Sequence, residues 1–256
     1  MPSSLPAGVP DGAKTIIVIP TYNEAENLPG LIAELLALGL AGLSVLVVDD
    51  NSPDGTGEVA ETLAKRFPDF VAVHHRPGKE GLGRAYVDGF KHALDMGADY
   101  IIQMDADFSH PPNAIPTMLA LIQEGDVVVG SRYVAGGELD ERWSWWRRFL
   151  SWWANEVWSR TFLGISTRDI TAGFKCWRRA TLLGIGLDRV GSDGYAFQVE
   201  MAYLTERLSY RAIETPIYFE DRRIGKSKMS ARAKIQGALD VFRIRWRHRK
   251  TLTRNA

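Results

Sequence analysis

The sequence predicts an α/β fold in which helices cover both faces of a mostly parallel sheet. Apolar, β-branched runs alternate with helical segments, and the connections between them are short. The runs are almost continuously apolar, as expected for strands that are buried on both faces. The 256 residues, 45% of them hydrophobic, suit a globular protein of this class.

The expected elements alternate regularly through the first half of the chain. Asn23 is a plausible N-cap for the first helix, because Glu24 and Glu26 fall in its first turn. Turn chemistry at residues 51–55 precedes the second helix. We expect strands at residues 14–19, 43–48, 70–74, 100–104 and 126–130, and helices at residues 23–38, 56–67, 81–96 and 112–123.

The pattern changes after Arg132. A Trp- and Arg-rich helix is expected at about 143–162, followed by strand-like pieces, a helix at 195–206, a strand at 210–219 and a basic helical end. We therefore divide the chain into a flexible tail (1–13), one α/β domain (14–230) that includes the Trp/Arg helix, and a basic helical tail (231–256).

Composition excludes several classes of protein. The 31 basic and 31 acidic side chains balance, so no global field favours a nucleic-acid partner. The single cysteine, Cys176, permits neither a disulfide framework nor a Cys-based zinc site, which fits a reducing cytoplasm. No apolar run reaches the roughly 18 residues needed to span a bilayer, and the first ten residues lack the features of a signal peptide.

Acidic side chains follow three of the expected strands. Glu24 follows the first strand, Asp49 and Asp50 the second, and Asp105 and Asp107 the strand at 100–104. Each has an ordinary explanation as a helix cap, a turn former or a strand terminator. The carboxyl ends of parallel strands share one edge, however, where ligands of open α/β sheets bind. Two hard oxygen donors there suit a divalent cation held against a diphosphate.

Other phosphate and nucleophile motifs are missing. The first strand is not followed by Gly-x-Gly-x-x-Gly, and the chain has no Gly-x-x-x-x-Gly-Lys-Ser/Thr loop. Gly81-Leu82-Gly83 opens a helix in mid-domain and is a weak signal alone. A Gly-x-Ser-x-Gly elbow is absent, and Cys176 has no obvious His partner in the sequence, so Ser and Cys hydrolases are disfavoured.

Several ordered motifs resemble those of the family-2 glycosyltransferases with the A-type fold. The resemblance is closer still to the dolichyl-phosphate and polyprenyl-phosphate mannose synthases, and it spans about residues 15–234. It rests on Ile19-Pro20-Thr21-Tyr22-Asn23-Glu24, residues 47–56, Met104-Asp105-Ala106-Asp107, Gly130-Ser131-Arg132-Tyr133, Asp169-Ile170-Thr171-Ala172-Gly173-Phe174 and residues 221–229.

The resemblance implies a Rossmann-like A-type fold with amphipathic C-terminal helices, and a role for each motif. Asp105, Asp107 and Arg132 would act in catalysis, with Asp105 and Asp107 on Mg²⁺ or Mn²⁺. Ser109 stands where some relatives have a stronger metal ligand, so the metal would rely on the two aspartates, the diphosphate and water. The donor, GDP-mannose, would be held by Pro20, Tyr22, Glu24, Val48, Asp50, Asp105, Ala106, Asp107, Arg222 and Lys228.

The acceptor implied by the resemblance is a polyprenyl monophosphate. Arg132, Arg147 and Ser151 would contact its phosphate, and Arg147 and Ser151 are four residues apart and so share a helix face. With a second pKa near ~6 this phosphate is largely dianionic, so it would attack the sugar with inversion and without a general base. Solvated arginines are the ordinary alternative for Arg147.

The Trp/Arg segment suggests a membrane surface. Six of the eight tryptophans lie between Trp143 and Trp158, and Trp with Arg on an amphipathic helix favours the membrane interface. Core packing is the alternative. We expect a peripheral enzyme on the cytoplasmic face of a membrane, and a membrane-anchoring partner protein remains open. Two alternative functions are transfer of a glucose-type sugar from a UDP-sugar to the same lipid, and a membrane-surface adaptor without enzymatic activity.

Overall fold

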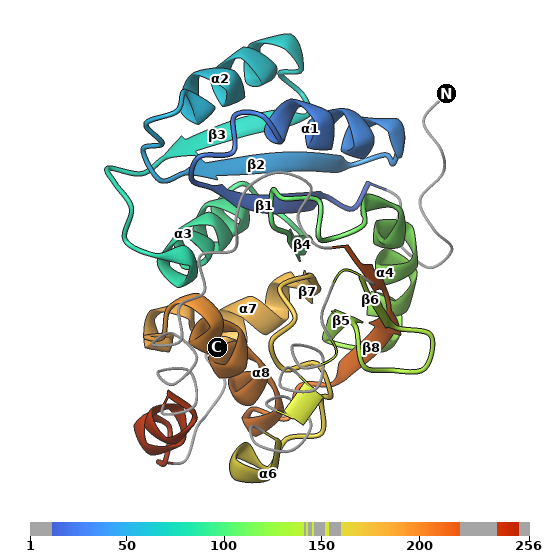
Figure 1. Ribbon diagram of the computed structural model, residues 1–256, viewed down its shortest axis with the longest axis vertical. Coiled ribbons are helices and arrows are strands. Elements are labelled where there is room, and N and C mark those ends of the chain that lie inside the picture. The colour runs from blue at the N-terminus through green and yellow to red at the C-terminus, as the bar shows by residue number, and fades with distance from the viewer. Residues whose placement is uncertain are drawn as a thin grey trace.

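The computed structural model describes residues 12–140, 142, 145, 152, 153, 160–220 and 240–250. Within these ranges the chain forms a seven-stranded sheet flanked by helices, and a small two-stranded sheet (Figure 1). The strands are β1 Thr15–Thr21, β2 Leu43–Asp49, β3 Val71–His75, β4 Tyr100–Gln103, β5 Val127–Ser131, β6 Glu138–Leu139, β7 Lys175–Arg178, β8 Ala212–Pro216 and β9 Tyr218–Phe219.

The helices lie between these strands, as the alternating pattern predicts. The α-helices are α1 Leu28–Ala37, α2 Thr56–Arg66, α3 Leu82–Asp95, α4 Ile115–Leu121, α6 Arg160–Leu163, α7 Arg179–Ile185 and α8 Gly194–Arg207, with short 3₁₀ turns η1 Pro112–Ala114, η2 Ile122–Glu124 and η4 Leu187–Arg189. Residues 240–247 are also helical.

The large sheet has the order β3-β2-β1-β4-β7-β5-β8. Its neighbours are parallel except at β7, which pairs antiparallel with both β4 and β5. Because β7 is reversed relative to both of its neighbours, β4 and β5 still run in the same direction. The predicted mostly parallel α/β sheet is therefore confirmed, with one antiparallel strand that the sequence pattern did not single out.

Two apolar layers hold the sheet between the helices. On one face Ile17, Ile19 and Val47 pack in a cluster with residues of α1, α2 and α4. On the other face Ile16, Val18 and their neighbours pack with α3, α7 and α8, which Figure 1 shows on the opposite side of the strands from α1 and α2. Alternate residues of β1 therefore enter different cores, as the two-residue period of a strand requires.

The start of the first helix differs from the sequence prediction. Asn23 has a left-handed backbone with φ of 62°, so it lies in a turn and does not cap α1. In this turn the backbone N–H of Asn27 donates to the Glu24 carbonyl oxygen at 3.1 Å. Asn27 is the residue before the helix, and Pro29 falls in the first turn, where its missing N–H costs nothing.

The expected strand at 210–219 is divided into two. β8 ends at Pro216 and pairs with β5, whereas β9 pairs with β6 in the small sheet. The N–H of Ile217, just after Pro216, still donates to the Ser131 carbonyl oxygen at 3.1 Å, and β5 ends at Ser131. This division sends Phe219 away from the main sheet and toward the site described below.

Some expectations fall wholly or partly outside the described residues. Of the Trp/Arg segment, the structure describes the exposed Trp145, Trp152 and Trp153, and α6 at its end. Of the tail expected at 231–256, residues 240–250 are described, and Val241 and Ile244 pack against α8. In the described ranges no helix is both long enough and apolar enough to cross a membrane.

Candidate active site

The carboxyl ends of four strands lie at one edge of the sheet. β1, β2, β4 and β5 run in the same direction, and each is followed by residues that the sequence assigns to the site. Arg132 follows β5 directly, and Asp50 follows β2 directly. The shared edge expected from a parallel sheet is therefore present, although β7 separates β4 from β5.

The segment from Asp105 to Asp107 lies in a bend just after β4, and is called the carboxylate turn below. Asp107 and Ala106 are buried, and Asp105 is partly exposed. The hydroxyl of Tyr86 donates to Oδ1 of Asp105 at 2.5 Å. Burial, reinforced by the charge of Asp105, raises the pKa of Tyr86 well above its ordinary value, so the hydroxyl keeps its proton. The charge of Asp107 raises the pKa of Tyr86 further.

Ser109 donates two hydrogen bonds to the carboxylate of Asp107. Its hydroxyl and its backbone N–H both donate to Oδ1 of Asp107, at 2.6 and 3.1 Å. The sequence left open whether Ser109 takes part in a metal site. Its hydroxyl proton is directed at the carboxylate, so Ser109 orients Asp107.

His110 closes the same turn. The backbone N–H of Asp105 donates to its Nδ1 at 2.9 Å, which makes the ring the neutral tautomer with its proton on Nε2. Burial lowers the pKa of His110 despite the two nearby carboxylates. The ring stacks on Phe174 with centroids 5.2 Å apart, and meets the edge of Phe219 at 6.1 Å. Sequence reasoning missed His110, although it lies within the same turn.

The residues present fit a divalent cation that takes further ligands from its substrate. In the described ranges no three His, Cys, Asp or Glu side chains form a cluster able to hold a metal. Asp105 and Asp107 supply two hard oxygen donors within one turn. Mg²⁺ is commonly bound by one or two carboxylates together with phosphate oxygens and water, and Mn²⁺ accepts the same ligands.

Asp50 is paired with an arginine that the sequence pattern did not reveal. The buried guanidinium of Arg76 donates from Nη1 to Asp50 and from Nε to Asp88 at 2.8 Å. Burial alone would lower the pKa of Arg76, but its hydrogen bonds to Asp50 and Asp88 raise it instead. Asp49 has another task, because Oδ1 accepts from the Ser52 hydroxyl at 2.6 Å within the turn.

Other residues that the sequence predicts to bind the nucleotide lie in or near the loops after β1 and β2. The backbone N–H of Glu24 donates to the Thr56 hydroxyl at 2.9 Å, which links the loop after β1 to the start of α2. The ammonium of Lys79 lies 3.8 Å from the centroid of the Tyr22 ring. Val48 is fully buried, and Pro20 is partly exposed.

Arg132 is held by a fully buried carboxylate. Its Nε and Nη2 donate to the two oxygens of Asp169 at 2.8 and 2.6 Å, and Nη2 also donates to the Thr171 hydroxyl at 2.8 Å. Burial alone would lower the pKa of Arg132, but the adjacent carboxylate of Asp169 has the larger effect and raises it. The guanidinium carbon lies 5.1 Å from the centroid of Phe219, so Arg132 and His110 share this ring as a neighbour.

Four residues assigned to the site lie outside the described ranges. They are Arg147, Ser151, Arg222 and Lys228.

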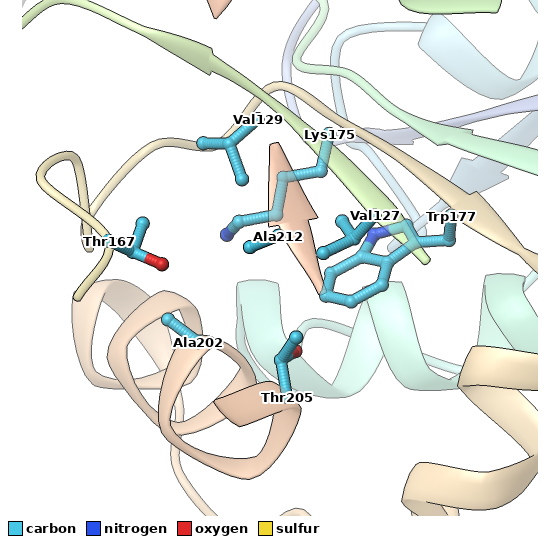
Figure 2. Close-up of a pocket in the computed structure, with 8 residues that line it drawn as sticks. All are labelled: Val127, Val129, Thr167, Lys175, Trp177, Ala202, Thr205 and Ala212. Carbon is cyan, nitrogen blue, oxygen red and sulfur yellow. The ribbon is translucent and has the colours of Figure 1, made fainter. Parts of the chain in front are cut away.

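A buried lysine lies beneath the site. Lys175 donates from Nζ to the Ala172 carbonyl at 2.6 Å and to Oε1 of Gln198 at 2.7 Å. Lys175 lines a cavity of about 10 Å³, and Figure 2 shows its side chain among the other residues that line it. Burial lowers the pKa of Lys175 to about 7. Because no nearby sequence pattern marks a lysine as buried, sequence reasoning missed this residue too.

The glycines at the start of α3 serve packing. A Cβ at Gly83 would lie 2.7 Å from the Ser192 carbonyl oxygen and 3.0 Å from Cβ of Phe197, so α8 approaches the helix closely there. The backbone N–H of Gly83 donates to the carboxylate of Asp193 at 2.6 Å. An aspartate therefore holds the start of this helix.

Comparison with known proteins connects this site to an enzyme family. The family described as Glycosyl transferase family 2 matches residues 16–180. An undecaprenyl-phosphate mannosyltransferase from Micrococcus luteus is 44% identical over 230 residues, which cover 90% of this chain and 93% of that protein. A polyprenol monophosphomannose synthase from Mycolicibacterium smegmatis is 44% identical over 226 residues, covering 88% of this chain and 84% of that protein.

Solved structures agree on the fold. Mannosyl-3-phosphoglycerate synthase from Rubrobacter xylanophilus has a TM-score of 0.63 at 19% identity, over 93% of this chain and 74% of that one. A mannosyltransferase from Pyrobaculum calidifontis, in complex with GDP-Man and Mn²⁺, has a TM-score of 0.61 at 19% identity, over 93% of this chain and 65% of that one. These likenesses support the A-type glycosyltransferase fold. The chain belongs to glycosyl transferase family 2 and is similar, along nearly its whole length, to polyprenyl-phosphate mannosyltransferases of that family.

Proposed function

We propose that the protein transfers mannose from GDP-mannose to a polyprenyl monophosphate, with inversion at the anomeric carbon, and releases GDP. The observation that carries the proposal is the carboxylate turn Asp105–Asp107 at the same sheet edge as the Arg132–Asp169 pair. One group suits the diphosphate of a donor, and the other suits an acceptor anion. The names of the two 44%-identical relatives support the sugar and the lipid, and the bound GDP-Man of a structural neighbour supports the donor.

The donor is held between the loops after β1 and β2 and the turn after β4. Asp50, fixed by Arg76, faces the nucleoside, and Tyr22 and Glu24 flank it. Asp105 and Asp107 would hold Mg²⁺ or Mn²⁺, which would take its other ligands from the donor and water. When bound, the cation neutralises charge that develops on the departing diphosphate.

The acceptor phosphate is itself the nucleophile. With a second pKa near ~6 it is largely dianionic at neutral pH, so no side chain has to remove a proton. A phosphate oxygen forms the new bond to the anomeric carbon as the bond to GDP breaks, and GDP leaves with the electron pair. Arg132 holds the phosphate in line for this attack. Nε and Nη2 donate to Asp169, while Nη1 donates to no described residue and is left to donate to the phosphate.

Arg147 and Ser151 add contacts to the acceptor phosphate, and Arg222 and Lys228 add contacts to the donor. Their assignment rests on the sequence motifs alone. The protein works at the cytoplasmic face of a membrane, where its lipid acceptor resides. Exposed indoles at Trp145, Trp152 and Trp153 favour such a surface. Binding to anionic liposomes at low salt tests this location, and failure to bind them would remove it.

A transfer assay tests the reaction. Labelled GDP-mannose, GDP-glucose, UDP-glucose and UDP-N-acetylglucosamine are each offered with a short polyprenyl phosphate. Product from GDP-mannose, lost on chelation of divalent metal and in Asp107→Ala, is the expected result. Product only from a UDP-sugar would replace the donor, and full activity without metal would remove the role given to the carboxylate pair. Membership of an enzyme family disfavours the adaptor function.

A further inference from the structure

Tyr86 is a buried tyrosine whose hydroxyl reaches the first carboxylate of the turn. It lies on α3, is fully buried, and donates to Oδ1 of Asp105 at 2.5 Å. A buried tyrosine hydroxyl needs an acceptor, and any nearby carbonyl would satisfy it. Here the acceptor is Asp105, a carboxylate proposed above to bind the metal. The choice of partner raises the question of what the bond does for Asp105.

The ring of Tyr86 is fixed by its neighbours. It stacks on Phe197 of α8, with centroids 5.7 Å apart and planes 4° from parallel, and it packs at 5.7 Å on Phe90 of its own helix. The start of α3 is tied to the loop before α8 by the bond from Gly83 to Asp193. The hydroxyl therefore projects from a packed interface between two helices, with little freedom to follow a moving carboxylate.

Asp105 is also fixed on its backbone side. Its N–H donates to Nδ1 of His110 at 2.9 Å, which sets the direction in which the side chain leaves the turn. With the backbone and Oδ1 both held, rotation about the bond to the carboxyl group is restricted. The direction of Oδ2 is then determined.

Gly173 lies next to the His110 ring and to Oδ2 of Asp105. A Cβ at Gly173 would lie 3.4 Å from Oδ2 of Asp105 and 3.0 Å from Cε1 of His110. No described residue donates a hydrogen bond to Oδ2. One oxygen of the carboxylate is thus occupied, and the other faces a position from which a side chain is absent.

We propose that Tyr86 is a positioning residue for the metal site, which makes Asp105 a one-oxygen ligand through Oδ2. The inference rests on the proposed function only in taking Asp105 to bind the metal. By occupying one lone pair of Oδ1, the hydroxyl would favour one-oxygen binding by this carboxylate, which would leave coordination positions for diphosphate oxygens. Partners in the outer shell of a metal commonly change its affinity by about 10- to 100-fold.

Removal of the single hydroxyl tests the proposal. Tyr86→Phe keeps the ring and its stacking, and Tyr100→Phe is the matched control, because the Tyr100 hydroxyl bonds to the amide of Gln123 at 3.0 Å and not to the carboxylate turn. Mn²⁺ affinity is measured by electron paramagnetic resonance with Mn²⁺ alone, and with Mn²⁺ in the presence of GDP or UDP. We expect about 10-fold weaker Mn²⁺ binding for Tyr86→Phe, with thermal unfolding recorded in parallel. The Tyr100→Phe protein should match the wild type.

Each outcome separates the inference from the wider proposal. Equal Mn²⁺ affinity in wild type and Tyr86→Phe would overturn the positioning role alone. A wild-type protein that binds no Mn²⁺ with either nucleotide would overturn the metal assignment together with it. Binding with UDP but not GDP would leave the positioning role standing and revise the donor. If Tyr86→Phe does not fold, Phe197→Leu loosens the stacked ring while retaining the hydroxyl, and an unchanged Mn²⁺ affinity in that variant would overturn the proposal.

Discussion

Arg132 and Asp169 form a forked ion pair in which two guanidinium nitrogens meet the two oxygens of a fully buried carboxylate, at 2.8 and 2.6 Å. The backbone N–H of Arg132 donates to the same carboxylate at 2.9 Å. Three bonds to one acceptor determine where the guanidinium points. The direction of Arg132, and not its charge alone, should therefore matter for the reaction.

Replacing Arg132 by lysine should separate direction from charge. Lysine keeps the charge but cannot make two parallel bonds to Asp169. We expect at least about a 10-fold fall in kcat/KM for the lipid acceptor, which corresponds to roughly 1.4 kcal/mol. Arg66→Lys, at an exposed arginine on α2, is the control and should leave the rate unchanged. Full transfer by Arg132→Lys, or by Arg132→Ala, would remove the acceptor role.

Arg76 should influence donor binding through Asp50. Arg76→Met retains much of the side-chain volume but leaves Asp50 buried without its cation. Breaking such a pair costs roughly 3–5 kcal/mol, so we expect a lower melting temperature and a KM for the nucleotide sugar that rises more than kcat falls. Arg84→Met is the control, because Arg84 is 69% exposed and contacts Glu80 at 3.6 Å, a carboxylate that Arg76 also contacts at 3.2 Å. An unchanged KM in folded Arg76→Met would contradict the assignment of Asp50.

Lys175 should make the free energy of unfolding increase with pH above neutrality. Its pKa falls from 10.5 to about 7 on folding, so between those values the unfolded chain binds more protons than the folded one. Stability from this residue therefore rises with pH across that window. Relative to Lys175→Met, wild type should gain roughly 2–3 kcal/mol in free energy of unfolding between pH 6 and pH 9. A difference that is constant with pH, measured by urea unfolding, would exclude this titration.

Glu200 should govern acid stability and the attachment of the helix at 240–247. It is fully buried and accepts from Arg247 at 2.7 Å and His248 at 2.8 Å. Burial would raise its pKa, but these partners lower it to about 2 from 4.5. The stabilisation, of order 3 kcal/mol, is present above pH 4.5 and is lost as the pH falls toward 2.

Glu200→Gln tests this account. The variant should be less stable at pH 7, and the difference from wild type should shrink below pH 4. Proteolysis should cut the C-terminal segment of the variant faster. Glu58→Gln, at an exposed site in the first turn of α2, is the control. Equal unfolding of wild type and Glu200→Gln at pH 7 would contradict the prediction.

The sequence revealed the site residues that follow strands, but not the residues that hydrogen-bond to them from distant parts of the chain. Strand ends are local features, so the positions of Asp50, Asp105 and Arg132 followed from apolar runs that stop at polar residues. The partners of these residues are distant or unmarked. Asp169 lies 37 residues from Arg132, and Tyr86 lies 19 from Asp105. No sequence periodicity links such pairs. The antiparallel pairing of β7 with β4 and β5 could not be predicted either, because it joins segments far apart in the chain.

The place of β7 in the sheet has a consequence for how the protein folds. β4 and β5 are separated by 23 residues in sequence but are joined only through β7, which is made some 44 residues after β5 ends. The sheet cannot be completed in the order of synthesis, because β5 has no partner in it until β7 arrives. Since long-range pairing slows folding, the edge of β4 should remain open on the ribosome until residue 178 has emerged. Only then do the turn at Asp105–Asp107 and the Arg132–Asp169 pair come to lie at one edge of the sheet.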